Sequence, residues 1–377
     1  MNGYEEKFFI TTGGLSMLKG IRVIDLSQNL PGPFATLRLA DMGAEVIKVE
    51  PPTGDGARTP LERDKKESFL FRSMNRSKKS VVLNLKDDAD REIALELIRD
   101  ADVLVESFRP GVMSRLGLGY ESVSSLNKGI VYCSLSGYGQ KGSIHHLGSH
   151  DINYMALSGI LSQMKDGDGR PIQPSMTFAD LVGGITASEA IVAALFKRER
   201  TGEGAFIDMA LQDAVTTLMN YHVLIESGTG RKDGLPVLNG NVICYNIYET
   251  KDGRYMTLGA LEPKFWRNFC FGVDKEEWIP VQFSPSDEKH DMHVAMKELF
   301  LSKTFDEWKS FSLAVDCCMT PVLETNELHD HPYVQERQLV FTEDGLRYMP
   351  TRYMGEGGDV RDFQSFPNLG EHTKEYK

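Results

Sequence analysis

The sequence predicts an α/β fold with a parallel, doubly wound sheet, joined to a second and smaller α+β domain. Short apolar stretches alternate with helical patterns through roughly the first 140 residues, and this alternation is typical of a parallel sheet covered by helices. Gly- and Pro-rich turns follow the apolar stretches. After residue 240 a hairpin pattern and then helical patterns take over, which indicates the separate domain.

The first βαβ unit comprises a strand over residues 18–26, a helix over 34–41 and a strand over 46–49. Three further strands follow, and an amphipathic helical pattern after Lys86 separates the first two of them. We expect these strands over residues 78–86, 103–107 and 129–139. Because strands and helices keep alternating, all of them are expected in one parallel sheet.

Two long helices are expected next, over residues 178–196 and 204–227, and a Gly-rich break over 228–240 ends them. The second domain begins with strands over 245–250 and 255–260, joined by a Lys-Asp-Gly turn, and continues with helices over 264–271, 290–300 and 305–314. We therefore expect residues 18–225 and 330–377 to form the large domain and 240–329 the small one. Residues 1–17 are expected to be a mobile leader.

The composition limits the kinds of partner that the protein is expected to bind. The net charge is −12 and the pI is about 5.3, so the surface as a whole repels nucleic acid and anionic membranes, and neither is expected as a partner. An anionic ligand needs a locally basic site. The five cysteines show neither zinc-site spacing nor an even count, which favours reduced thiols and a cytoplasmic protein. No uninterrupted apolar run reaches the length of about 18 residues that spans a bilayer.

Three distant segments supply a histidine and carboxylates that could carry chemistry. His150 and Asp151 follow a glycine loop in "GSHDINYMALSGIL", Asp180 enters an apolar helix in "MTFADLVGG", and Glu262 precedes a proline in "LGALEPKFW". If Asp151 begins a helix, its backbone N–H can hold an oxyanion. Each residue alone has an equally ordinary explanation, because aspartate and glutamate are common at helix starts and lone histidines are often structural.

Other sequence signals are weak or missing. His146 and His150 have a spacing that could share a metal on a helix, but glycine and serine between them indicate a loop and no third ligand follows, so no metal is expected. The sequence has no G-x-G-x-x-G after its first strand, no P-loop and no G-x-S-x-G elbow. Dinucleotide binding through a phosphate loop and serine hydrolysis are therefore not indicated.

Several segments together resemble the family III CoA-transferases, also called CaiB/BaiF-type proteins. They are "GIRVIDLSQNLPGPFATLRLADMGAEVIKVEPPTGD", "SMNRSKKSVVLNLK", "VLVESFRPGVMSRLGLGY" and "TPVLETNELHDHP". The likeness covers residues 18–373. It implies a Rossmann-like large domain and a small domain, and a homodimer of two interlocked chains. In such a dimer the active site lies between the large domain of one chain and the small domain of the other.

The resembled family contains two kinds of enzyme. Transferases use the aspartate that matches Asp180 as a nucleophile, whereas racemases of α-methylacyl-CoA thioesters use it as an acid and base. The racemase pattern is His-Asp before an "INY" helix together with a "G-A-(I/L)-E-P" turn, and this sequence has "SHDINY" and "GALEP". One departure is Ser149, where the racemase pattern has glycine. The resemblance thus implies racemisation of 2-methylacyl-CoA thioesters, with CoA transfer to a carboxylic acid as the alternative and a non-catalytic acyl-CoA-binding protein as a third reading.

The resemblance also implies a role for each site residue. His150 and Asp180 would remove and return the α-proton on opposite faces, Glu262 would make His150 more basic, and Asp151 would offer its backbone N–H. No cofactor is expected, because CoA is part of the substrate. The residues at CoA-binding positions are Arg109, Arg115, Lys78 and Lys79 for the phosphates, Phe108 and Leu83 for the adenine, and Tyr245 for the substrate pocket.

Overall fold

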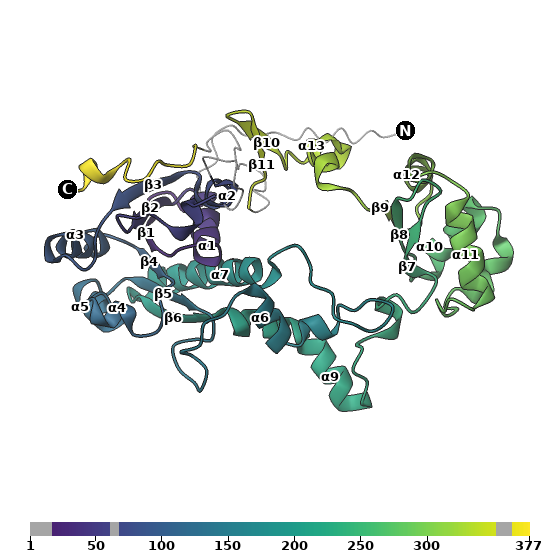
Figure 1. The fold of residues 1–377 in the computed structure, drawn as a ribbon, viewed down its shortest axis with the longest axis horizontal. Coiled ribbons are helices and arrows are strands. Elements are labelled where there is room, and N and C mark those ends of the chain that lie inside the picture. Colours follow the sequence, from purple (N-terminus) through teal and green to yellow (C-terminus); the bar gives the residue numbers. More distant parts are fainter. Residues whose placement is uncertain (1–16, 61–67, 352–363) are drawn as a thin grey trace. The chain divides into compact units, whose positions relative to one another are not determined.

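The computed structural model describes residues 17–60, 68–351 and 364–377, and it separates into two compact units that are described one at a time (Figure 1). Unit 1 comprises Met1–Leu218 and Gln335–Lys377, and unit 2 comprises Met219–Val334. The sequence places these boundaries at the 225–240 linker and at residue 330. The expected leader falls almost entirely outside the described residues.

A six-stranded parallel sheet forms the centre of unit 1, in the order β3-β2-β1-β4-β5-β6 (Figure 1). The strands are β1 (Arg22–Leu26), β2 (Glu45–Glu50), β3 (Lys78–Val82), β4 (Val103–Glu106), β5 (Val131–Ser136) and β6 (Ala205–Ala210). This order reverses direction between β1 and β4, which makes the sheet doubly wound. The prediction of an α/β fold with a parallel sheet is confirmed.

The central strands form because both faces of the sheet are covered. Every residue of β4 and β5 is buried, as expected of parallel strands between two layers of helices. One layer of core joins Ile24, Leu104 and Tyr132 of the sheet to Ile98 of α3 (Asp88–Arg99). Unit 1 also contains three shorter helices, α2 (Phe69–Asn75), α4 (Val112–Arg115) and α5 (Tyr120–Leu126).

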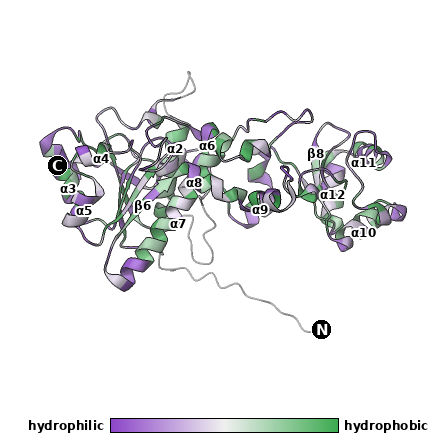
Figure 2. Ribbon diagram, turned by 90° about the horizontal axis from the view of Figure 1, so that it is seen from below, coloured by the Kyte–Doolittle hydropathy of each residue, from purple (hydrophilic) through white to green (hydrophobic). Residues whose placement is uncertain are grey.

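The long helix α7 (Phe178–Thr201) packs against α1 (Pro31–Ala40), and most of it is coloured as hydrophobic in Figure 2. The two helices approach closely at Gly184, where an added Cβ atom would lie 2.8 Å from the carbonyl oxygen of Pro31. By length and composition α7 is the one helix among the described residues that could cross a membrane. Since it also contacts α6, α8, β5 and β6, its apolar character is explained by packing inside unit 1.

The prediction of a helix over residues 204–227 is wrong at the start of this range. Residues 205–210 form β6, which pairs in parallel with β5 along its whole length. Phe206 contributes to this edge of the sheet because its ring lies 5.0 Å from that of Tyr120 and 5.7 Å from that of Tyr132. Only after β6 does the chain become helical, in α8 (Leu211–Thr216) and α9 (Asn220–Thr229).

Unit 2 is a small α+β domain around an aromatic core. Its antiparallel sheet has the order β7-β8-β9. The strands are β7 (Tyr245–Glu249), β8 (Tyr255–Gly259) and β9 (Met319–Pro321), and the helices are α10 (Pro263–Gly272), α11 (Asp291–Leu301) and α12 (Phe305–Ala314). Trp266 and Trp308 are buried and donate their indole N–H groups to the carbonyls of Trp278 and Phe300, so the polar atoms of this core are satisfied.

The chain then passes through α13 (Pro332–Glu336) and a hairpin of β10 (Phe341–Glu343) and β11 (Leu346–Tyr348). The last residues return to unit 1, where the backbone N–H of His372 donates to the carbonyl of Ser80 in β3. The tail therefore rejoins unit 1.

Candidate active site

The segment that carries His150 and Asp151 begins α6 (Asp151–Leu157). His150 precedes the helix, is exposed, and is held by its backbone N–H, which donates to the side-chain oxygen of Asn153 at 2.9 Å. Asp151 occupies the first turn. The carboxylate of Asp151 accepts a hydrogen bond from the backbone N–H of Asp180 at 3.0 Å. The structure thus brings the starts of α6 and α7 together, although 29 residues separate them in the chain.

Asp180 lies in the first turn of α7 and is partly buried. Burial, and to a lesser extent the neighbouring Asp151, raise the pKa of its carboxyl to about 6, while His150 acts in the opposite direction. The three residues therefore lie close enough to influence one another electrostatically. A carboxyl group with a pKa near neutrality can both give and take a proton under ordinary conditions.

Tyr154 lies near Asp180 and is not among the site residues that the sequence indicates. Its ring is buried, its hydroxyl accepts a hydrogen bond from Ser149 at 2.8 Å, and its ring packs edge-on against Tyr138. Burial raises the pKa of Tyr154, and Asp180 contributes to that rise. Ser149, which stands where the racemase pattern has glycine, thus holds the hydroxyl of a tyrosine that lies near enough to Asp180 to feel its charge. Tyr154 is the tyrosine of the "INY" motif. Its polar hydroxyl on an otherwise apolar helix face is the sequence feature that could have indicated it.

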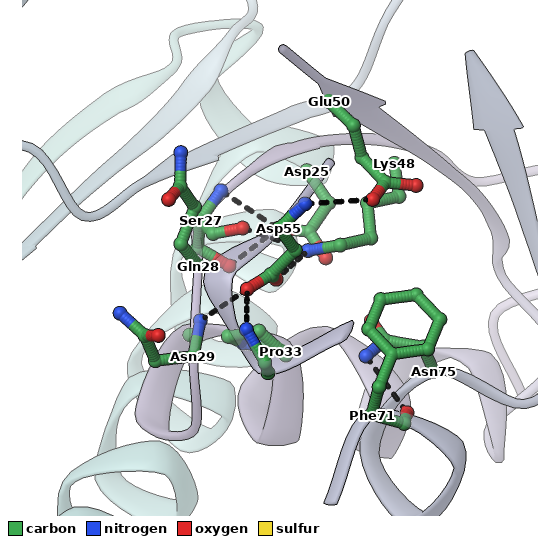
Figure 3. A network of polar contacts seen from close by, with 12 residues as sticks. Asp25, Ser27, Gln28, Asn29, Pro33, Lys48, Glu50, Asp55, Phe71 and Asn75 are labelled. Carbon is green, nitrogen blue, oxygen red and sulfur yellow. Dashed lines mark hydrogen bonds and ion pairs between the residues drawn. The ribbon is translucent and has the colours of Figure 1, made fainter. Parts of the chain in front are cut away.

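The turn after β1 lies at the switch point of the sheet, but its backbone donors are already used. The N–H groups of Ser27, Gln28 and Asn29 donate to the side chains of Asp25, Ser107 and Asp55, respectively. Figure 3 shows the part of this network around Asp25, Lys48 and Asp55.

Two prolines, Pro31 and Pro33, also remove N–H donors from the first turn of α1. Since neither the turn nor the helix start keeps its usual set of free donors, this segment does not form the dinucleotide-type phosphate site of other doubly wound folds. The missing G-x-G-x-x-G motif agrees with this geometry.

The loop after β4 lies on the other side of the switch point and carries Phe108 and Arg109. Phe108 is partly buried and packs against the sheet core. Arg109 is exposed, and a Cβ atom placed on Gly148 would lie 3.3 Å from its Nη2 atom. Arg109 therefore lies against the loop that leads to His150. Arg115, at the end of α4, is also exposed, and its Nη1 atom would lie 3.2 Å from a Cβ atom on Gly111 in the same loop.

The structure corrects two of the expected CoA-binding residues. The side chain of Lys78 is completely buried and donates to Asp25 at 3.0 Å, to Thr36 at 2.8 Å and to Asn75 at 2.9 Å. It cannot reach a phosphate because its donors are used inside unit 1. Leu83 is 1% exposed and belongs to the apolar core, so its side chain offers no surface to an adenine.

Lys79 remains at the surface, where it pairs with Glu45 at 3.0 Å and donates to the hydroxyl of Tyr376. Both contacts raise the pKa of Lys79.

In unit 2, Glu262 occupies the N-cap position of α10 without a capping hydrogen bond from its side chain, and it is exposed. Tyr245 begins β7 opposite Gly259 of β8, three residues before Glu262. The exposed thiol of Cys318 lies near enough for Glu262 to raise its pKa. The fold of unit 2 thus brings Tyr245 and Glu262 to one end of its sheet. Because Glu262 and His150 belong to different units, their pairing stays a prediction.

An open, mainly apolar pocket begins two residues beyond His150. It has a volume of about 480 Å³, and its apolar lining comes from Ile152, Leu161, Pro171 and Ile172. Asp166 and Arg170 contribute polar groups from the hairpin that crosses it. Among residues 17–60, 68–351 and 364–377, no group of three or more His, Cys, Asp or Glu side chains is arranged to hold a metal ion.

Comparisons with known proteins agree with this architecture. The sequence profile of CoA-transferase family III matches residues 18–373. Alpha-methylacyl-CoA racemase of Homo sapiens is 35% identical over 368 residues, which cover 95% of this chain and 92% of that relative. Acetyl-CoA:oxalate CoA-transferase of Acetobacter aceti is 44% identical over 241 residues, but these cover only 62% of this chain and 61% of the relative.

Solved structures include a hypothetical protein from Mycobacterium tuberculosis, with a TM-score of 0.82 at 28% identity, covering 96% of this chain and 99% of that one. A CAIB/BAIF family protein from Brucella suis superposes with a TM-score of 0.83, covering 96% of this chain and 98% of that one; at 24% identity it supports the fold alone.

Proposed function

This chain belongs to the family III CoA-transferases, and from that premise we propose that it racemises 2-methylacyl-CoA thioesters. One of His150 and Asp180 removes the α-proton, leaving an enolate whose negative charge rests on the thioester oxygen. The other returns a proton to the opposite face, so that the configuration of the α-carbon inverts and no atom is gained or lost. The backbone N–H of Asp151 is assigned to the thioester oxygen.

The observation that carries this proposal is the environment of Asp180. Its carboxyl group is partly buried beside His150, and burial together with the charge of Asp151 raises its pKa to about 6. A carboxyl group with a pKa near neutrality suits a reaction that must run in both directions, because Asp180 has to act as base for one enantiomer and as acid for the other.

Two sequence motifs, rather than the extent of the similarity, support racemisation over CoA transfer. The racemases align with nearly the whole chain, so the similarity extends through the units that carry His150, Asp180 and Glu262. Two transferase relatives match with higher identity, 41% and 44%, but over only 64% and 62% of the chain. Two others match 95% and 88% of the chain at 32% identity. The "SHDINY" and "GALEP" segments add the histidine and the glutamate that proton transfer uses.

CoA transfer is the second candidate, and the identity of 44% to a transferase favours it. In that reaction the Asp180 carboxylate attacks the thioester carbonyl, expels the CoA thiolate and forms a mixed anhydride. The two candidates use the same aspartate. They differ in whether the α-proton exchanges and whether a covalent intermediate forms on Asp180.

We further propose a homodimer. Several large apolar side chains of unit 1 and of α9 are strongly exposed in the single chain, among them Phe196, Val223 and Leu224 at 63%, 63% and 73%. Apolar surface of this kind is commonly buried by a second subunit. The reaction needs no cofactor besides the CoA of its substrate, because proton transfer alone inverts the centre. A cytoplasmic location remains an expectation from the cysteines.

The deciding experiment incubates one pure enantiomer of a 2-methylacyl-CoA with the enzyme in deuterated water, without any acid acceptor. Racemisation predicts loss of optical purity together with deuterium at the α-carbon. His150→Ala is expected to slow exchange from one enantiomer more than from the other, and Asp180→Asn to show the reverse preference. Retention of the α-proton, with CoA exchange appearing once a carboxylic acid is added, would establish the transferase instead.

A further inference from the structure

A buried carboxylate without a cationic partner lies at the end of β4, directly before the loop of Phe108 and Arg109. Glu106 is 4% exposed. Its Oε2 atom accepts the backbone N–H of Phe108 at 2.8 Å, and its Oε1 atom accepts the hydroxyl of Ser134 in β5. Among the residues that the structure describes, no ion pair of Glu106 occurs.

The hydrogen bonds continue beyond Ser134. Its Oγ atom accepts a side-chain N–H of Gln140 at 2.8 Å, and the backbone N–H of Gln140 donates to the carboxylate of Asp208 in β6 at 3.0 and 3.1 Å. A line of contacts therefore crosses the carboxyl ends of β4, β5 and β6. It joins the loop of Phe108 and Arg109 to the glycine-bearing segment that leads to His150.

We propose that Glu106 is a positioning residue for CoA: its ionised carboxylate fixes the Phe108–Arg109 loop and, through Ser134 and Gln140, ties that loop to the segment preceding His150. The inference rests on the proposed function only in taking CoA as the ligand of this loop. Glu106 need not touch CoA itself, since it acts through the backbone of Phe108 and the orientation of Arg109.

The direction of the hydrogen bonds explains why the ionised form is required. Gln140 donates to Ser134, Ser134 donates to Glu106, and Phe108 donates to Glu106 from the other side. A protonated carboxyl group keeps one accepting oxygen and carries a donor on the other, so either the hydroxyl of Ser134, which is 1% exposed, or the N–H of Phe108 loses its acceptor. Leaving a buried donor unsatisfied is unfavourable.

Burial makes this protonation accessible near neutral pH. It raises the pKa of Glu106 to about 7, while the hydrogen bonds from Ser134 and Phe108 act in the lowering direction. The titratable side chains that face it from β5 are Tyr132 and Cys133, whose own pKa values the carboxyl raises, and from β6 Asp208 acts on Cys133. As the pH falls through about 7, Glu106 takes up a proton and the loop loses its anchor.

A competing effect has the opposite sign. A negative charge near the loop repels the phosphates of CoA, so neutralising Glu106 would strengthen binding if charge outweighed position. The variant Glu106→Gln separates the two effects because it removes the charge, keeps the shape and, like the protonated acid, replaces one of the two acceptors by a donor.

The test measures the dissociation constant of CoA by calorimetry on the full-length protein between pH 6 and 8.5. The wild type is expected to lose about tenfold in affinity from pH 8.5 to pH 6, whereas Glu106→Gln is expected to bind about tenfold more weakly at pH 8.5 and to depend little on pH. Ser134→Ala and Gln140→Ala should weaken binding in the same direction, and Glu121→Gln, an exposed glutamate of α5, serves as the matched control.

Equal or tighter binding of CoA by Glu106→Gln at pH 8.5 would overturn the proposal, as would a Ser134→Ala variant that binds CoA like the wild type. Thermal melting verifies that each variant is folded. The readout is independent of racemisation. If these effects on CoA binding occur but the α-proton stays in place, the role of Glu106 is supported and only the proposed reaction is wrong.

Discussion

The backbone N–H of Asp180 donates to the carboxylate of Asp151 at 3.0 Å and thereby joins the first turn of α7 to the first turn of α6. The contact fixes the position of Asp180 and also places a second negative charge beside it, which raises the pKa of the Asp180 carboxyl. Asp151 thus influences the chemistry of Asp180 through geometry and through charge, and these two influences can be separated experimentally.

Asp151→Asn is expected to shift the pH dependence of catalysis to lower pH. The amide keeps an oxygen that accepts the N–H of Asp180 but carries no charge, so the pKa of Asp180 falls. Because Asp180 must be ionised to remove a proton, a lower pKa leaves it active at a lower pH. A shift of the acid limb by about half a unit to one unit is expected. The measurement is the pH profile of kcat/KM for α-deuterium exchange with the enantiomer that Asp180 deprotonates.

Asp168→Asn provides the control, since Asp168 is exposed in the nearby hairpin and should leave the acid limb unchanged. An acid limb that stays in place or moves to higher pH in Asp151→Asn contradicts the prediction. A loss of activity at every pH without a shift would assign Asp151 a role in position alone.

The sequence predicted most strands of unit 1 because strands covered on both faces leave continuous apolar runs, as in β4 and β5. It missed β6 because its residues, Ala205–Ala210, run into α8 without a glycine or proline. The spatial order of the strands was also beyond the sequence. That order depends on crossover connections, which hydrophobic patterns do not encode.

For the site, the sequence indicated His150, Asp151 and Asp180, and the structure brings them together. Lys78 was assigned wrongly for a physical reason. Side chains alternate between the two faces of a strand, so Lys78 points into the core of unit 1 while its neighbour Lys79 stays partly exposed. A motif that contains both lysines does not reveal which face is covered.

Removing the partner of Lys78 is expected to destabilise the fold strongly. The carboxylate of Asp25 accepts hydrogen bonds from Lys78 at 3.0 Å and from Thr36 at 2.6 Å, and both ion-pair side chains are fully buried. Asp25→Ala leaves a buried ammonium group without its partner, which costs about 3–5 kcal/mol. The free energy of unfolding is measured with urea at pH 7.

Asp88→Asn is the matched control for that variant. Its ion pair with Arg91 is at the surface, where Asp88 is 90% exposed, and a change of less than about 0.5 kcal/mol is expected. The pKa of Asp25 is held far below its ordinary range by Lys78 and Lys48. Its stabilising contribution should therefore be complete at neutral pH and be lost as the pH falls below about 4. Equal stability of the two variants at pH 7 would contradict the proposed role of the buried pair.

Arg109→Ala should weaken CoA binding more than Lys79→Ala. Arg109 is exposed against the segment before His150, whereas Lys79 already pairs with Glu45 and Tyr376. Loss of a charge-assisted contact to phosphate corresponds to a weakening of about 10- to 100-fold. The expected pattern is a higher KM with little change in kcat, measured with one acyl-CoA at constant ionic strength. A larger effect of Lys79→Ala would place the phosphates at β3 instead.

The last prediction concerns Glu262, which belongs to unit 2, and His150, which belongs to unit 1. If the proposed homodimer forms each active site from His150 of one copy and Glu262 of the other, two inactive variants can rescue each other. In a mixed dimer of His150→Ala and Glu262→Ala, one site carries both substitutions and the other carries neither. Equal co-expression makes half of the dimers mixed, so about a quarter of the wild-type racemase activity is expected.

Sites formed within a single chain give the opposite result, because every site of the mixed dimer then carries one substitution. Each variant is expected to be nearly inactive when purified alone, which supplies the baseline. Co-expression of His150→Ala with Asp180→Asn is the matched control: both residues belong to unit 1, so each site of that mixed dimer should keep one defect and no activity should return. Absence of rescue with Glu262→Ala, in a preparation where both chains co-purify, would contradict a shared site.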